Sequence, residues 1–285
     1  MKTLIIDGNN LIHRTFWTAK KVAGENTGQL DNFHIHFTLN AIFSYVNRYK
    51  PTQTIVVWDE KQVKTQNTRK VSFPEYKGNR SADPAPHKNN NTVKRLLNSV
   101  GIPSIYPYER EADDIVAYIC KTYAGSKVVV SVDRDFLQLV NSDTILFDPI
   151  RKREFIINTF KVDTGWCKEE WLKAKCCEGD KSDNVPGIHR FGKVKIRKWL
   201  DGDLQLTEEQ QQIVDRNLTL FSLDAVMQCK DECIYYQDQL DAPVVSKWDK
   251  FITECEERDL KNILKKRDEW YNLFIMGNKL TQLLG

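Results

Sequence analysis

Short apolar runs alternate along the chain with stretches whose apolar residues recur at helical spacing. The runs cover residues 4–6, 54–58, 102–106, 127–132 and 144–147. Runs of this length, bounded by polar or turn-forming residues, are typical of buried strands. Because helical stretches separate them, the pattern predicts an α/β fold with a mostly parallel central sheet flanked by helices.

The helical stretches divide the chain into two predicted regions. Helices are predicted at 33–49, 92–100, 111–124, 166–177, 194–200, 207–236 and 246–275, and a turn at 7–10. Residues 60–95 are polar and contain three prolines, so we expect an exposed, partly helical excursion. We therefore predict a core over residues 1–180 that includes this excursion, and a helical C-terminal region over 181–285.

Composition adds little to this picture except in what it excludes. The chain has 285 residues, of which 41% are hydrophobic and 28% charged, as expected of a globular protein with a real core. Seven cysteines in a chain of this length argue against a disulfide framework. No apolar run approaches the roughly 20 residues that span a bilayer. The N-terminus reaches an acid too soon for a signal peptide. We expect a cytoplasmic protein, in the host cytoplasm if a virus encodes it.

Acidic residues gather where the predicted strands end. Asp7, Asp59 and Asp133 each follow a different apolar run, and function gathers at the carboxyl ends of parallel strands. The stretch 109–135 adds further acids. The dipole of a helix N-terminus explains one or two of them, but not a second pair after the next strand. Like charges held this close repel unless cations lie between them, and hard oxygen ligands suit magnesium or manganese.

Basic residues are concentrated in two segments, although the net charge is only +3. Residues 61–95 carry nine Lys or Arg against two acids, a local balance of +7. Residues 184–202 carry five against one acid, a balance of +4. A charged run is often only a solvated face, but basic segments beside an acidic cluster also suggest a polyanion guided onto metal ions.

Six short motifs follow one another in a specific order. They are Ile5-Ile6-Asp7-Gly8-Asn9, Trp58-Asp59, Phe73-Pro74-Glu75-Tyr76-Lys77-Gly78-Asn79-Arg80, Glu111-Ala112-Asp113-Asp114, Ser131-Val132-Asp133-Arg134-Asp135-Phe136 and Gly179-Asp180-Lys181-Ser182-Asp183-Asn184-Val185-Pro186-Gly187. In this order they resemble the 5′-nuclease family, which includes flap endonucleases, 5′→3′ exonucleases and the RNase H enzymes of some bacteriophages.

The resemblance implies a metal site, and the reaction would be two-metal-ion phosphodiester hydrolysis with Mg²⁺, which Mn²⁺ could replace. Lys77 and Arg80 would contact the scissile phosphate, and Tyr76 would stack on a base. The implied metal-facing residues are Asp7, Asp59, Glu111, Asp113, Asp114, Asp133, Asp135, Asp180 and Asp183.

A helix–turn–helix element that grips duplex phosphates would lie at about residues 184–202. Its basic residues are Arg190, Lys193, Lys195, Arg197 and Lys198. The match departs from the family here, because Arg190 stands at a position that is usually Gly. The implied partners are DNA with 5′ flaps, nicks or 5′ ends, RNA:DNA hybrids, and replication proteins such as single-strand-binding protein. A monomer, with no membrane association, is expected.

Three other classes remain as alternatives. A haloacid-dehalogenase-like phosphatase needs a second acid two residues after Asp7, where this chain has Asn9. A PIN-type ribonuclease has a similar acidic core but is usually far shorter and lacks the motif at 73–80. A non-catalytic nucleic-acid-binding relative would be expected to have lost the acids, which are all present.

Overall fold

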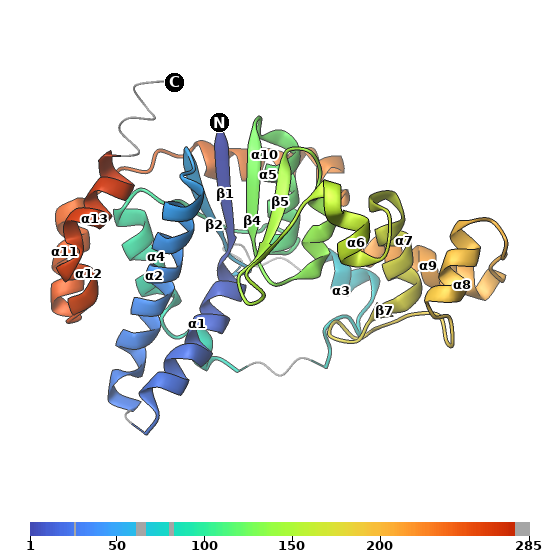
Figure 1. Ribbon diagram of the computed structural model, residues 1–285, viewed down its shortest axis with the longest axis horizontal. Helices are drawn as coiled ribbons and strands as arrows, with labels where there is room; N and C mark the ends of the chain where they lie inside the picture. The colour runs from blue at the N-terminus through green and yellow to red at the C-terminus, as the bar shows by residue number, and fades with distance from the viewer. Residues whose placement is uncertain (26, 61–66, 80–82, 277–285) are drawn as a thin grey trace.

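A six-stranded sheet with the order β3-β2-β1-β4-β5-β6 forms the centre of the protein (Figure 1). The computed structural model describes residues 1–25, 27–60, 67–79 and 83–276. All neighbouring strands are parallel except β5 and β6. This arrangement confirms the predicted α/β class. The strands are β1 (Lys2–Asp7), β2 (Gln53–Val57), β3 (Ser104–Ile105), β4 (Ser126–Val130), β5 (Thr144–Asp148) and β6 (Arg153–Phe155).

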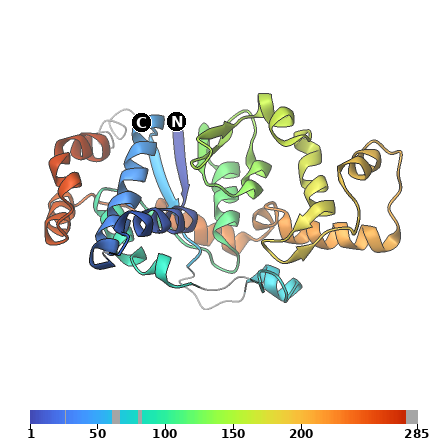
Figure 2. The same cartoon turned by 60° about the horizontal axis from the view of Figure 1, so that its bottom comes forward.

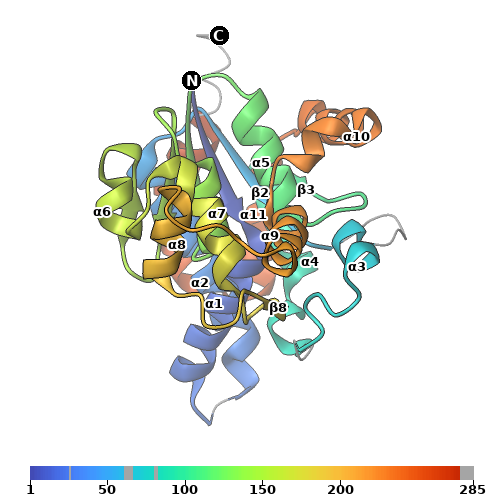
Figure 3. The same cartoon turned by 90° about the vertical axis from the view of Figure 1, so that its right-hand side faces the viewer.

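Helices cover both faces of this sheet. One face carries α1 (Gly8–Ala23), α2 (Leu30–Tyr49), α4 (Asn90–Ser99), α11 (Trp248–Glu257), α12 (Lys261–Lys265) and α13 (Arg267–Tyr271). The other carries α5 (Ala112–Thr122) and α10 (Lys230–Asp241), and the core on this side continues beyond the sheet into α7 (Lys168–Glu178), α8 (Lys193–Leu200) and α9 (Glu208–Phe221) (Figure 1). Two short helices, α3 (Thr68–Ser72) and α6 (Phe160–Thr164), complete the set. Figure 3, in which the right-hand side of Figure 1 faces the viewer, shows α7, α8 and α9 in front of the sheet.

Alternate side chains of the strands supply the two cores. Leu4 and Ile6 of β1 pack into one core, while Ile5 between them packs into the other. All three are fully buried. A strand covered on both faces has no solvent side, which explains why the strands read as continuous apolar runs instead of alternating ones.

The segment after β1 differs from its prediction. Residues 8–23 form the helix α1, where the sequence predicted only a turn at 7–10. Asp7 is the N-cap of this helix, and its side chain accepts a hydrogen bond from the backbone N–H of Asn10. Turn-forming residues and N-caps use the same residue types, so the sequence pattern could not separate the two.

Residues after 180 do not share a core of their own. Val214 of α9 and Tyr236 of α10 belong to the same hydrophobic core as residues of β1 and α5. Phe251 of α11 and Trp270 of α13 pack with α2 and α4 on the opposite face. The division into a core over residues 1–180 and a helical region over 181–285 stays a prediction. Among the residues described, no helix has the length and apolar character needed to cross a membrane.

The basic excursion is partly core. Its described part contains α3 and the segment that follows, and both Arg69 and Tyr76 are buried there. The expectation of an exposed excursion is wrong for these two residues. Figures 1 and 2 show α1, α3 and the antiparallel pair β7 (Gly179–Asp180) and β8 (Val185–Pro186) at the end of the molecule where β1 finishes.

Candidate active site

The carboxyl ends of the three central strands lie in one row. Asp7 at the end of β1 pairs with Val57 of β2, and the residue before it pairs with Val130 of β4. The chain leaves both neighbouring strands just beyond these pairs, and Asp59 and Asp133 follow within three residues. Register alone therefore brings three acids from distant parts of the sequence to one edge of the sheet.

Asp7 is held rigidly. One carboxylate oxygen accepts from the backbone N–H of Asn10 at 3.0 Å, and the other accepts from Ser131 Oγ at 2.7 Å. Close packing fixes the next residue as glycine, because a Cβ on Gly8 would lie 2.6 Å from a ring carbon of Trp58. The turn from β1 into α1 therefore leaves Asp7 little freedom to move.

Asp59 joins this row to the start of α5. Its Oδ1 accepts from the backbone N–H of Ala112 at 2.9 Å, and its own N–H donates to Asn9 Oδ1 at 3.2 Å. The first turn of α5 is thereby docked against the end of β2. Asp113, the next residue of the helix, is consequently close enough to Asp59 and Asp133 for their charges to interact.

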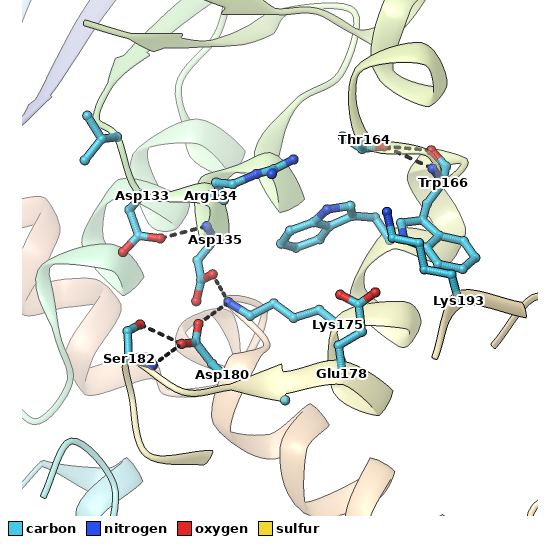
Figure 4. A pocket seen from close by; sticks show the side chains of 13 residues that line it. Asp133, Arg134, Asp135, Thr164, Trp166, Lys175, Glu178, Asp180, Ser182 and Lys193 are labelled. Atoms are coloured by element: carbon cyan, nitrogen blue, oxygen red, sulfur yellow. Dashed lines mark hydrogen bonds and ion pairs between the residues drawn. The ribbon is translucent and has the colours of Figure 1, made fainter. Parts of the chain in front are cut away.

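Asp133 and Asp135 project from the loop and short 3-10 helix that follow β4. The N–H of Asp133 donates to Ser131 Oγ at 3.0 Å, and the N–H of Asp135 donates to Asp133 Oδ1 at 2.8 Å. Ser131 thus links Asp7 and Asp133 through a single hydroxyl. Figure 4 shows the carboxylates of Asp133 and Asp135 beside the same pocket.

The inner carboxylates, Asp7, Asp113 and Asp133, resist ionisation. Burial, together with the charges of Asp59 and Asp133, raises the pKa of Asp7 to about 7 against the two hydrogen bonds, which lower it. Burial, then Asp133 and Asp59, hold the pKa of Asp113 well above its usual range. Burial also raises the pKa of Asp133, although Lys175 opposes this. These groups repel one another without enough positive charge among them.

The outer carboxylates, Glu111, Asp135 and Asp180, are paired with lysines. Lys77 Nζ lies 2.7 Å from Glu111 Oε1. Lys175 contacts Asp135 and lies 3.2 Å from Asp180 Oδ2, as Figure 4 shows. Burial would raise the pKa of Glu111, but the nearby cations outweigh it and lower the pKa. Burial would also raise the pKa of Asp180, but the hydrogen bond from Ser182 and then the charge of Lys175 lower it.

Hydrogen bonds tie the segment 73–79 to the acidic loop 180–184. The backbone N–H of Lys77 donates to the carbonyl of Asp183 at 2.7 Å. The side-chain amides of Asn79 and Asn184 add two bonds of 2.9 Å between the same segments. Lys77 has a φ of 56°, a left-handed conformation that costs a non-glycine residue about 1–2 kcal/mol. These bonds hold that conformation and so place the ammonium beside Glu111. Asp183 is itself buried in this contact.

Two predicted site residues do not have the expected surroundings. Tyr76 is 3% exposed, and its hydroxyl donates to Glu111 Oε2 at 3.0 Å, so its ring has no open face on which a base could stack. Asp114 is fully buried, and both its oxygens accept from Arg69. An aspartate whose two oxygens are occupied by a guanidinium is not available as a metal ligand. Both predictions are corrected accordingly.

The predicted helix–turn–helix element is not confirmed. Residues 184–202 contain β8 and the single helix α8, and the next helix, α9, begins only at Glu208. Arg197 pairs with Glu170 at 2.7 and 2.9 Å, so its charge is already neutralised within the protein. The other four basic residues predicted there (Arg190, Lys193, Lys195 and Lys198) are exposed. Arg80 lies outside the described residues.

A cavity of about 460 Å³ opens beside the carboxylates (Figure 4). Asp133, Asp135 and Asp180 line one side of it, and Arg134 and Lys193 line the other. The site is therefore accessible from a surface that carries both signs of charge.

The donor set fits hard divalent cations, because every candidate ligand is a carboxylate oxygen. As they stand, no three Asp, Glu, His or Cys side chains within the described ranges are arranged to hold one ion. Lysines contact the outer carboxylates, whereas at the inner ones the nearby positive charge does not outweigh burial and mutual repulsion. A cation at the inner carboxylates would relieve that repulsion.

The sequence did not predict two cations that pair with carboxylates at this site. Lys175 lies in the last turn of α7, and nothing in the neighbouring sequence distinguishes it from a solvated lysine. Arg69 belongs to the excursion, whose basic residues we expected to be exposed. Both are identified only by their tertiary contacts: Arg69 contacts Asp114, and Lys175 contacts Asp135 and Asp180.

Comparison with known proteins places this geometry in a family. The model of the 5′-3′ exonuclease, N-terminal resolvase-like domain matches residues 2–171. The chain belongs to this family of nucleases, which are phosphodiester hydrolases.

Curated relatives match over part of their length. The chain is 30% identical to a 5′-3′ exonuclease of Aquifex aeolicus over 204 residues, which cover 67% of this chain and 66% of that protein. It is 26% identical to DNA polymerase I of Caldicellulosiruptor bescii over 228 residues, covering 75% of this chain and only 26% of the polymerase.

Solved structures share the fold. The 5′-exonuclease of T5, with bound zinc ions, has a TM-score of 0.67 at 21% identity, covering 85% of this chain and 99% of that one. Flap endonuclease-1 from Methanococcus jannaschii has a TM-score of 0.56 at 16% identity, covering 96% and 92%. At these identities the likeness describes the fold alone.

Proposed function

We propose that this protein is a divalent-metal-dependent 5′ nuclease that hydrolyses phosphodiesters at 5′ flaps, nicks and 5′ ends. The observation that carries the proposal is the set of inner carboxylates with raised pKa values, which lie at the aligned ends of β1 and β4 and in the first turn of α5. Such a site is stable in its charged form only with cations bound, and a phosphodiester is a substrate that such cations attract.

The proposed metal-facing residues are the predicted set without Asp114. Asp7, Asp59, Asp113 and Asp133 would hold one Mg²⁺ or Mn²⁺, and Asp135, Asp180 and Asp183 would face a second, with Glu111 between Lys77 and the first. The ions would lower the pKa of an attacking water and stabilise the departing 3′ oxygen. Two solved structures of similar fold, both of T5 nuclease, support metal binding in this protein, since one contains zinc ions and the other contains DNA and metal ions.

Basic residues of the protein would contact the phosphates of the substrate. Lys77 lies beside the carboxylates, and the carboxylates raise the pKa of its ammonium despite its burial. It would therefore stay charged and could move from Glu111 to the scissile phosphate, where charge develops in the transition state. Arg134 and Lys193 would contact the flanking phosphates across the cavity.

Charge recognition of this kind extends the proposal to RNA:DNA hybrids, because phosphate oxygens are common to both nucleic acids. All the carboxylates named come from one chain, so a monomer would suffice. The proposed cofactor is Mg²⁺. The proposed role in the cell is the removal of 5′ flaps or RNA primers during DNA replication or repair.

Product sizing on three substrates tests it. A 3′-labelled 5′-flap duplex, a nicked duplex and an RNA:DNA hybrid are each incubated with Mg²⁺, with EDTA replacing the metal as the control. We expect Mg²⁺-dependent release of the 5′ strand from the flap and the nick. Single-stranded RNA is incubated in parallel as a further substrate. Cleavage of this RNA, with none of the other three cut, would contradict the proposal and favour a PIN-type ribonuclease.

A further inference from the structure

Arg69 is a buried cation that joins three separate parts of the structure. It lies on α3, is 6% exposed, and donates to both oxygens of Asp114 on α5 at 2.5 and 2.8 Å. Its Nε donates to the carbonyl of Leu220 at the end of α9, at 2.7 Å. A planar guanidinium can make all these bonds at once, and a lysine cannot.

The same guanidinium touches a carboxylate of the proposed metal site. Arg69 Nη1 lies 3.4 Å from Glu111 Oε2, which also accepts from the Tyr76 hydroxyl, while Lys77 binds the other oxygen. All three donors come from the segment 67–79. The backbone N–H of Glu111 in turn donates to Asp114 Oδ2 at 3.1 Å, so its main chain is fixed through the partner of Arg69.

We infer that Arg69 is a positioning residue for Glu111, which makes the geometry of the metal site depend on the docking of both α3 and α9. This inference rests on the proposed function and deepens it. Glu111 keeps its orientation only while the segment 67–79 and the end of α9 are in place. The site is therefore assembled from the N-terminal excursion and the C-terminal helices together.

A purely stabilising role for the pair is the competing explanation. Removing Arg69 alone would leave the Asp114 charge buried without a partner, and the protein could fail to fold for that reason. The double variant Arg69→Met/Asp114→Asn avoids this problem. It removes both charges, and the Asn oxygen can still accept from the N–H of Glu111.

Cleavage and binding separate the two explanations. For Arg69→Met/Asp114→Asn we expect a parent-like melting temperature and DNA affinity in EDTA, with single-turnover cleavage of a 5′-flap duplex slowed about 10–100-fold, as for other residues that orient a metal ligand. A parent-like rate would overturn the inference. Arg69→Lys, which keeps the buried charge, should fold and show a smaller loss, and a parent-like rate there would overturn it as well.

Metal binding gives a readout that does not depend on turnover. Calorimetric titration with Mn²⁺ should show binding weakened about tenfold in Arg69→Met/Asp114→Asn. The same double change should have little further effect once Glu111→Gln is present, because residues that act through one another are not additive. An equal loss of Mn²⁺ affinity in both backgrounds would show that Arg69 does not act through Glu111.

An exposed ion pair remote from the site provides the control. Arg48 on α2 and Glu154 on β6 form an ion pair of 2.7 Å at the far edge of the sheet. Arg48→Met/Glu154→Gln should cleave and bind Mn²⁺ like the parent. If the parent protein itself fails to cleave the flap with Mg²⁺, the proposed function fails, while the Mn²⁺ titration still decides the role of Arg69.

Discussion

The inner and outer carboxylates share one site but differ in how their negative charges are neutralised. The outer ones, Glu111, Asp135 and Asp180, have lysines within contact distance, whereas the inner ones depend on hydrogen bonds from Ser131 and a few backbone N–H groups. The pKa of Asp7 accordingly rises to about 7, and that of Glu111 falls. The protein thus neutralises its outer acids with lysines, and we propose that a bound cation neutralises the inner ones.

The largest effect is expected when one of the inner carboxylates is removed. Asp133→Asn should lower the cleavage rate at least about a thousandfold, because several kcal/mol of charge stabilisation by the metal would be lost. Binding of flap DNA in EDTA should be largely kept, since the exposed basic residues are untouched. Rate measurement with Mg²⁺ and a binding assay in EDTA check both halves. Full activity would show that the inner carboxylates hold no catalytic metal.

Loss of Lys77, the partner of Glu111, should lower the rate of cleavage more than the affinity for DNA. Lys77→Ala should slow single-turnover cleavage about 10²–10³-fold, the usual cost of losing a group that stabilises developing charge. The dissociation constant for the flap duplex should change far less. A variant that kept the parent's single-turnover rate would remove Lys77 from the mechanism and leave it as a partner of Glu111 only.

Sequence and structure agree best where a local pattern fixes the outcome. Apolar runs gave the strands, and the register of parallel strands then carried Asp7, Asp59 and Asp133 to one edge. The predicted turn after Asp7 was wrong, because the residue types that form turns also serve as helix N-caps. The environments of Tyr76 and Asp114 could not be predicted, since burial of a polar residue depends on partners from remote segments.

Removing the lysine between two outer acids tests the other half of the comparison. Lys175→Met should destabilise the metal-free protein by about 1–3 kcal/mol, because Asp135 and Asp180 lose their common partner. Added Mg²⁺ should narrow the difference from the parent, as a cation replaces the ammonium. Thermal unfolding with and without Mg²⁺ measures both effects. A deficit that stayed the same with Mg²⁺ would argue that no ion reaches these two acids.

The pH dependence of stability should reflect the inner carboxylates. Since the folded pKa of Asp7 is raised to about 7, the folded state binds more protons than the unfolded state between about pH 4 and pH 7. Its contribution to stability is therefore present at low pH and lost as the pH rises through 7. Lowering the pH from 8 to 6 should stabilise the metal-free protein by about 1.4 kcal/mol through this group.

Calorimetric unfolding of the metal-free protein at several pH values measures this effect, with Asp7→Asn as the control that should remove much of it. Glu111 and Asp180, whose pKa values are lowered, act in the opposite direction, and their contribution is lost only below about pH 4. A stability that rose steadily from pH 6 to pH 8 would contradict the assignment of raised pKa values to the inner carboxylates.

The most direct test of the account is to locate the cation. Crystals of the protein grown with Mn²⁺ should give an anomalous difference peak among the oxygens of Asp7, Asp113 and Asp133, with the side chains turned toward it. Anomalous density confined to other parts of the surface, or none at saturating Mn²⁺, would contradict the claim that these three carboxylates form a metal site.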